Sequence, residues 1–154
     1  MTIAIGADHA GFRLKARIAE VLREGGHTVL DFGTDSDASV DYRDFAQATA
    51  WEVASGRAER GILICSSGIG MSIAANKVPG IRAALATTEE STRLLRSHND
   101  ANVITLGASF IEEPVAVRLV EIFLDTAFDG GRHERRLAKI TELERSGRVP
   151  SSTF

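Results

Sequence analysis

The sequence predicts a three-layer α/β fold, in which a doubly wound, five-stranded parallel sheet has helices on both faces. Short β-rich runs alternate with helical patterns, and residues 61–65 are apolar throughout, as is typical of a central strand covered on both faces. Each strand is followed by a helix, the connection that parallel strands require. The 154 residues, 44% hydrophobic and 25% charged, suit one globular domain at residues 1–146 with a loose tail at 147–154.

The expected strands and helices follow in order along the chain. Strands are predicted at residues 3–7, 27–33, 61–65, 81–86 and 102–107. The first two helices show apolar side chains at helical spacing: Leu14, Ile18, Val21 and Leu22, then Ala46, Ala50, Val53 and Ala54.

The later helices are marked by their ends. The helix expected at 71–78 stops at a proline, and Thr87 with Glu90 has the spacing of a capping box for the next helix. Pro114 suits the first turn of a long helix, and residues 132–145 form the last one.

The composition of the chain limits the classes of partner that the protein is expected to bind. A net charge of −3 gives no general attraction for nucleic acid or acidic membranes, so neither is expected as a partner. The start lacks a signal-peptide pattern, and no apolar run approaches the roughly 20 residues that span a bilayer. One cysteine excludes an internal disulfide and a multi-thiolate zinc site, and the four histidines lack a metal-binding spacing. We therefore expect a cytoplasmic protein without a metal site.

Ligands of parallel α/β sheets bind beyond the carboxyl ends of the strands, where the strand order reverses. Polar residues near strand ends are therefore candidates for function: Asp8 and His9, Asp41 and Tyr42, Cys65 to Ser67, and Ser97 to Asn99 before the fifth strand. We expect all of them to lie at this edge.

Residues 66–70 follow a strand and open a helix, so several backbone N–H groups can converge on negative charge. A plain tight turn would show the same pattern. The dinucleotide-binding motif would need a third glycine, and the Walker spacing of Gly6 and Gly11 is not followed by Lys-Ser/Thr. The turn favours neither a dinucleotide nor a nucleoside triphosphate.

Cys65 closes the predicted central strand directly before this turn. It is a small buried hydrophobe, a phosphatase nucleophile, or a base that moves protons on a phosphorylated substrate. The phosphatase pattern Cys-x5-Arg fails because Met71 stands at the position of the arginine. The other two interpretations stay open, and the start of a helix favours the thiolate that a base requires.

The remaining candidates also have alternatives. Asp8 alone would suit a phospho-accepting receiver domain, but the lysine which that class needs at the end of the fifth strand is missing. Arg132 and Arg136 lie on one face of the last helix, which suits either a phosphate dianion or a solvated basic surface. His27 is expected to be structural, and His98 alone would suit a surface role.

Together these residues resemble the ribose-5-phosphate isomerase B family, also called the ribose/galactose isomerase family. The matching stretches cover nearly the whole chain in the family's order: GADHAGF (6–12), VDYRDFA (40–46), residues 62–84, SHNDANVITLG (97–107) and GGRHERRL (130–137). The resemblance implies a flavodoxin-like, Rossmann-like fold and interconversion of an aldose phosphate and a ketose phosphate without a cofactor. It also implies a homodimer with shared active sites, and pairing of dimers into tetramers stays open.

The resemblance implies catalytic roles for four residues. Cys65 is similar to the base that removes the proton α to the carbonyl, and Ser67 to the hydroxyl residue beside O1 and O2 of the substrate. His98, assisted by Asp8, resembles the acid–base group that opens the sugar ring. Some relatives use a glutamate just after the turn, but Met71 stands there in this chain.

The resemblance further implies a set of substrate-binding groups. The backbone of the glycine turn should hold the enediolate oxygen: Ser66, Ser67, Gly68, Ile69 and Gly70. Tyr42 and Asn99 resemble residues that bind the hydroxyl groups of the sugar. The family's phosphate-binding residues are matched by His9, Arg132 and Arg136.

This sequence departs from the family pattern at two positions. Ser66 replaces a usual glycine and Arg43 a common proline, and the added Ser66 side chain could shift the sugar preference. We expect conversion of ribose 5-phosphate to ribulose 5-phosphate through an enediolate. The alternatives are erythrose 4-phosphate, allose 6-phosphate or galactose 6-phosphate as substrate, or a non-catalytic sugar-phosphate-binding module.

Overall fold

A computed structural model of the chain describes residues 1–147 and confirms the predicted α/β fold. All strand pairs of its five-stranded sheet are parallel. The strands are β1 (Thr2–Ala7), β2 (Thr28–Asp31), β3 (Arg60–Cys65), β4 (Ala83–Leu85) and β5 (Val103–Gly107). The helices are α1 (Phe12–Glu24), α2 (Tyr42–Ala54), α3 (Ile69–Ala75), α4 (Glu89–Ser97), α5 (Glu113–Asp125) and α6 (Arg132–Ser146). Of the tail expected at 147–154, residues 148–154 lie outside the described part.

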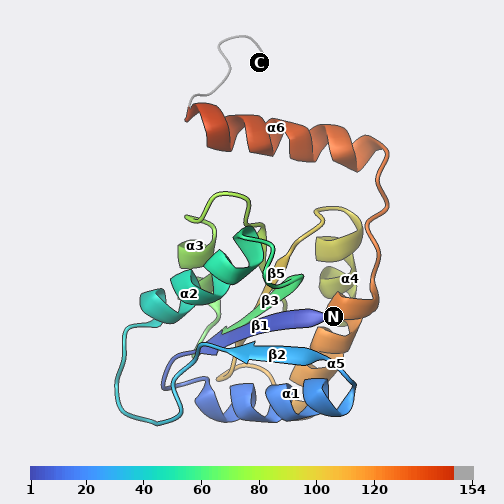
Figure 1. The fold of residues 1–154 in the computed structure, drawn as a ribbon. Helices are drawn as coiled ribbons and strands as arrows, with labels where there is room; N and C mark the ends of the chain where they lie inside the picture. Colours follow the sequence, from blue (N-terminus) through green and yellow to red (C-terminus); the bar gives the residue numbers. More distant parts are fainter. Residues whose placement is uncertain (148–154) are drawn as a thin grey trace.

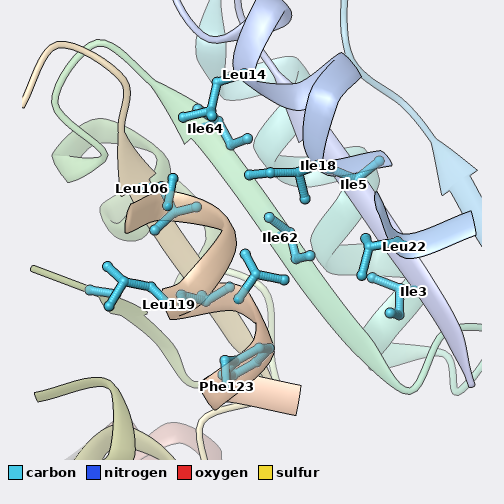
Figure 2. Packing of buried hydrophobic residues seen from close by; sticks show 14 of the residues in the cluster. Ile3, Ile5, Leu14, Ile18, Leu22, Ile62, Ile64, Leu106, Leu119 and Phe123 are labelled. Atoms are coloured by element: carbon cyan, nitrogen blue, oxygen red, sulfur yellow. The ribbon is translucent and has the colours of Figure 1, made fainter. Parts of the chain in front are cut away.

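Two hydrophobic cores flank the sheet because successive side chains of a strand point to opposite faces. Ile62 and Ile64 pack with α1, α4 and α5 in the larger core, part of which is shown in Figure 2. Leu63 and Cys65 point to the other face, where they pack with α2 and α3. The thiol therefore lies on the α2/α3 side of the sheet.

The strand order is β2-β1-β3-β5-β4, so β5 and not β4 lies beside β3. This exchanges the last two strands relative to the flavodoxin order 2-1-3-4-5. The order reverses between β1 and β3, where the rule for open α/β sheets places a ligand. The carboxyl end of β5 also comes to lie against the residues that follow Cys65.

Two expectations about the β4 region were inexact. The capping box that opens α4 is formed by Thr88 and Ser91, one residue beyond the predicted pair: Thr88 Oγ1 accepts from Ser91 N at 3.1 Å. The strand is shorter than residues 81–86, because the Arg82 amide donates to the Asn102 side-chain oxygen at 2.8 Å instead of to a neighbouring strand.

The last helix, α6, stands apart from both cores and crosses above α2, α3 and α4 (Figure 1). Near its end, Glu144 accepts two hydrogen bonds of 3.0 Å from the Gly80 amide, which ties this part of the helix to the loop after α3. Among residues 1–147, no helix combines the length and apolar character needed to cross a bilayer.

Candidate active site

The turn between β3 and α3 begins at Cys65, which is 5% exposed. The Gly68 amide donates to Cys65 Sγ at 3.1 Å. This contact needs the left-handed backbone of Gly68, whose φ of 75° is unfavourable for other residues. The sulfur thus belongs to the turn as well as to the core, which distinguishes it from an ordinary buried hydrophobe.

The hydroxyls of the turn have defined partners. Ser67 Oγ accepts from the Ile69 amide at 3.3 Å and so caps the turn from within. Ser66 Oγ lies 2.9 Å from Ser109 Oγ, and the Ser109 amide donates to Ser66 O at 3.0 Å. Ser66, which stands where the family usually has glycine, therefore directs its hydroxyl to the loop that follows β5.

The loop after β1 lies beside the same turn, because the Asp8 amide donates to Ile64 O at 3.3 Å. Asp8 is 6% exposed, and its Oδ1 accepts from the amides of Ala10 and Gly11 at 3.0 and 3.2 Å. The carboxylate is thus held by the backbone of its own loop.

His9 and Tyr42 connect this loop with the start of α2. His9 Nδ1 accepts from the Val40 amide at 3.3 Å, just before that helix. Tyr42, the first residue of α2, lies over Gly70: a Cβ added there would be 2.8 Å from Tyr42 Cζ. Arg43, the other departure from the family pattern, forms an exposed ion pair with Asp44, with 2.9 Å between Nη1 and Oδ1.

These residues form what we call the carboxyl-edge cluster, made of Asp8, His9, Tyr42, Cys65 and residues 66–70. All of them follow β1 or β3, or begin α2, at the switch point of the sheet. The structure therefore brings together this part of the predicted site.

The expectation that His98 and Asn99 share that edge was wrong. α4 returns across the sheet after β4, so its C-terminal cap, His98, lies where β5 begins. Consistent with this, Arg82 Nε, just before β4, donates to Asn99 O at 3.1 Å. The six residues of β3 span roughly 20 Å between the two edges.

The loop that carries His98 and Asn99 is held by ion pairs to Asp100. This carboxylate contacts Arg82 at 2.8 Å and Arg96 at 2.7 Å, and the Arg96 side chain is 4% exposed. Asp100 also has a φ of 43°, the only positive φ of a non-glycine residue in the described chain. Arg82 and Arg96 thus fix the backbone next to Asn99.

The first turn of α6 joins the same edge through the ring of His133. His133 stacks on His98 with ring centroids 4.2 Å apart and an angle of 15° between the planes. Arg132 adjoins His133, with Nε 3.5 Å from Nε2, and Arg136 follows one turn later. We call His98, Asn99, Arg132 and Arg136 the amino-edge cluster.

The profile of the ribose/galactose isomerase family matches residues 3–140 of this chain. The chain belongs to this family. It is 44% identical over 142 residues to ribose-5-phosphate isomerase B of Escherichia coli, covering 92% of this chain and 95% of that protein.

Solved structures of family members are similar over nearly the whole chain. Ribose-5-phosphate isomerase B of Clostridium thermocellum has a TM-score of 0.94 at 48% identity, covering 96% of this chain and 100% of that chain. The Mycoplasma genitalium structure, with bound ribulose-5-phosphate, has a TM-score of 0.90 at 41% identity, covering 94% and 97%.

The electrostatics of this isomerase-family chain are most distinctive at His133. Burial lowers the His133 pKa below its usual 6.5, and the charges of His98, Arg132 and Arg136 lower it further, while Asp129 raises it. His98, Asp129 and His133 have ligand atoms within 4.8 Å of one another. The two rings are nearly parallel, so their nitrogen lone pairs do not converge on one point as those of a chelate would.

Three residues that contact the predicted site were not identified from the sequence: Asp100, Ser109 and His133. Each acts through a contact between segments far apart in the chain, as in the Ser109–Ser66 hydroxyl pair. One signal was available for Ser109, since it follows the end of a strand, where ligands of α/β sheets bind.

Proposed function

We propose that this family member interconverts ribose 5-phosphate and ribulose 5-phosphate. The observation that carries the proposal is its similarity, at a TM-score of 0.90, to a family structure with bound ribulose-5-phosphate. The carboxyl-edge cluster supports it, because a thiol and a turn of backbone amides lie together at the switch point of the sheet.

The isomerisation step needs a base and fixed donors to the developing oxyanion. In the proposed mechanism, the Cys65 thiolate removes the proton from C2 of the open-chain aldose, and the C–H electron pair becomes the C1–C2 double bond of the enediolate. The negative charge on O1 is met by amides of residues 66–70 and by the Ser67 hydroxyl. The thiol then returns the proton to C1 while the O2 proton passes to O1, leaving the ketone at C2. One such donor is typically worth about 10²–10³ in rate.

Ring opening precedes this step because ribose 5-phosphate is mainly a furanose in solution. His98 donates a proton to the ring oxygen as the C1–O4 bond breaks, and the electron pair of that bond stays on O4. The Asp8 carboxylate accepts the proton of the anomeric hydroxyl, so that the C1–O1 double bond forms. In this scheme, Cys65, His98 and Asp8 exchange protons with the sugar, and one proton passes within the sugar from O2 to O1.

The separation of the two clusters supports a homodimer with shared active sites. Since they lie at opposite edges of one sheet, one protomer does not enclose a single sugar phosphate between them. We propose that the amino-edge cluster of each protomer faces the carboxyl-edge cluster of its partner. Exposed apolar residues support an interface there: Ile69 and Phe110, 54% and 79% exposed, line one pocket with Ser67. Light scattering distinguishes this dimer from a tetramer of paired dimers.

A substrate panel tests the reaction itself. Purified protein is mixed with ribose 5-phosphate, erythrose 4-phosphate, allose 6-phosphate or galactose 6-phosphate, and formation of the ketose is followed. We expect ribose 5-phosphate to give the highest kcat/KM. A higher value for another sugar would reassign the substrate, and binding without turnover of any of them would indicate a sugar-phosphate-binding module.

Mixing two inactive variants tests the shared site. In a heterodimer of Cys65→Ala and Arg132→Ala subunits, one site carries both changes and the other carries neither, so random exchange should restore about a quarter of the activity. The matched control mixes Cys65→Ala with Asp8→Asn, both in the carboxyl-edge cluster, and should restore none. Equal behaviour of the two mixtures after verified subunit exchange would contradict the shared site.

We also propose that the protein works in the cytoplasm, where a reducing environment keeps its single thiol available as a base. Fractionation of the source cells tests this. The location is wrong if the protein co-purifies with an oxidising compartment.

A further inference from the structure

His133 is the only buried side chain of α6, all fifteen residues of which are described. Its ring lies flat on that of His98, with centroids 4.2 Å apart. The segment between α5 and α6 is fixed at the same place, because the Asp129 amide donates to Ser97 O at 2.9 Å. The first turn of α6 is therefore docked on the end of α4 through this pair of histidines.

The contact with Arg132 determines which His133 nitrogen carries the proton. Arg132 Nε donates to His133 Nε2 over a long 3.5 Å. A guanidinium has no acceptor, so Nε2 must offer its lone pair, and the proton of the neutral ring sits on Nδ1. The edge of the His133 ring thus contacts Arg132, the proposed phosphate-binding residue, and its face contacts His98, the proposed ring-opening residue.

The surrounding charges favour the neutral ring as well. The ionisable groups that face His133 are His98 from α4, Arg132 and Arg136 from α6, and Asp129 from the connecting segment. Burial and the three basic groups lower the His133 pKa from 6.5, against the single carboxylate. The lowered pKa of His133 therefore favours its neutral ring at neutral pH.

We propose that His133 is a positioning residue that couples phosphate binding at Arg132 to ring opening by His98. The proposal rests on the proposed function for the roles of Arg132 and His98. The neutral ring fixes the plane of the His98 imidazole by stacking, and its Nε2 orients the Arg132 guanidinium. A phosphate dianion on Arg132 and Arg136 offsets the positive charge that these residues place beside the two stacked rings, which links phosphate binding to His98.

Two substitutions separate the two contacts of His133. His133→Phe keeps a flat ring for stacking but removes the acceptor for Arg132, whereas His133→Asn keeps an acceptor and removes the ring. His27→Phe is the matched control, since His27 precedes β2 and its ring lies 3.4 Å from the nitrogen of the amino terminus, away from the glycine turn. Thermal unfolding of each variant shows whether the fold is retained.

The activity test compares a ring-opening reaction with one that needs none. Ribulose 5-phosphate has no furanose form because its O5 carries the phosphate, so deuterium exchange from D₂O into its C1 requires only the proton transfer at Cys65. We expect both His133 variants to lose about 10- to 100-fold in kcat on ribose 5-phosphate, as for a misplaced catalytic group, and less than about 3-fold in the exchange rate at saturating ribulose 5-phosphate, where weaker phosphate binding has no effect. Equal losses in both reactions, or none, would overturn the coupling.

The pH profile gives a readout that a merely structural residue would not change. At acid pH, His133 takes up a proton, loses the bond from Arg132 and adds positive charge beside Arg132 and Arg136, so wild-type kcat/KM on ribose 5-phosphate should fall. His133→Phe has no ionisable group at this position. On the acid side of its pH profile, the slope of log kcat/KM against pH should therefore be smaller by up to one. An unchanged slope in this variant contradicts the proposal.

A measurement without sugar keeps the coupling separable from the proposed function. Inorganic phosphate is titrated into the protein while the imidazole resonances are followed by NMR. In the wild type, the His98 and His133 signals should move together with one apparent affinity, and in His133→Phe the change at His98 should shrink although phosphate still binds Arg136. If His98 responds equally in both proteins, the coupling is wrong whatever the isomerase assays show. A coupled response in a protein that turns over no sugar phosphate would contradict only the proposed function.

Discussion

The two clusters of this chain are held in place by different kinds of contact: main-chain hydrogen bonds at the carboxyl edge and side-chain contacts at the amino edge. At the carboxyl edge, Asp8 is held by amides of its own loop and Cys65 by an amide of the turn, and both are at most 6% exposed. At the amino edge, the residues lie at the end of α4 and in the first turns of α6, and side-chain ion pairs and a stacked pair of histidine rings hold this region. Proton transfer between adjacent carbons demands geometry that main-chain contacts supply. In the proposed function, the phosphate dianion is instead bound by the long basic side chains of Arg132 and Arg136.

The largest effect is expected at the carboxyl edge. Cys65→Ala should lower kcat by at least about 10³ and leave substrate binding intact, because a base acts in the transition state. Steady-state kinetics and a binding titration separate the two quantities. Cys65→Ser is the matched variant, with a hydroxyl of similar size but far weaker acidity, and it should be almost as slow. Near-normal kcat in either variant would remove Cys65 from the mechanism.

Breaking the charge network tests whether the amino edge depends on side chains. In Asp100→Asn, the new residue also adopts a positive φ readily, so the backbone is not strained. The change removes the negative charge that pairs with Arg82 and Arg96, so it should lower the free energy of unfolding by about 1–3 kcal/mol. Chemical denaturation measures this loss. Asp35→Asn in an exposed loop is the control and should change little. If both variants are equally stable, ion pairs do not hold this edge.

Removing a phosphate contact should affect binding more than the chemical step. Arg136→Ala should raise KM for the sugar phosphate about tenfold or more, as for a lost charge-assisted hydrogen bond, with a small change in kcat. Arg135→Ala on the same helix is the control for a general loss of positive charge. Similar KM values for the two variants would make this face of α6 merely solvated.

A smaller effect is expected where Tyr42 covers the turn. Gly70→Ala places a methyl group 2.8 Å from Tyr42 Cζ, so the ring must move and kcat/KM should fall several-fold. In Tyr42→Ala the space is open, and adding Gly70→Ala should then cost nothing further. A double-mutant cycle of kcat/KM measures this coupling, and strictly additive losses would contradict the packing of the ring on the turn.

The smallest effect concerns the hydroxyl pair of Ser66 and Ser109, 2.9 Å apart and exposed. Ser66→Gly restores the residue that is usual in the family, and Ser109→Ala removes the partner. Each should change kcat/KM on ribose 5-phosphate by less than about 3-fold, the size of one exposed hydrogen bond. The ratio between ribose 5-phosphate and galactose 6-phosphate is the sensitive readout, and an unchanged ratio would exclude this pair from sugar preference.

The sequence was sufficient for the fold and for the carboxyl-edge cluster, because both follow from local patterns. Apolar runs and helical spacing located the strands and helices, and the residues after β1 and β3 reach one edge in any parallel sheet. His98 was misplaced because it precedes a strand, and segments before and after parallel strands lie at opposite edges. The contacts of Asp100, Ser109 and His133 depend on the strand order and on the path of α6, and neither leaves a periodic signal.

The strand order has a consequence for how this chain acquires its structure. β4 pairs only with β5, and β5 fills the position between β4 and β3. During synthesis, β4 therefore emerges before the only strand with which it pairs, and it must stay unpaired while β3 can already pair with β1. The turn that holds the thiol gains its last support only when residues 103–107 insert, so nascent chains that end before this point should be vulnerable to proteolysis there.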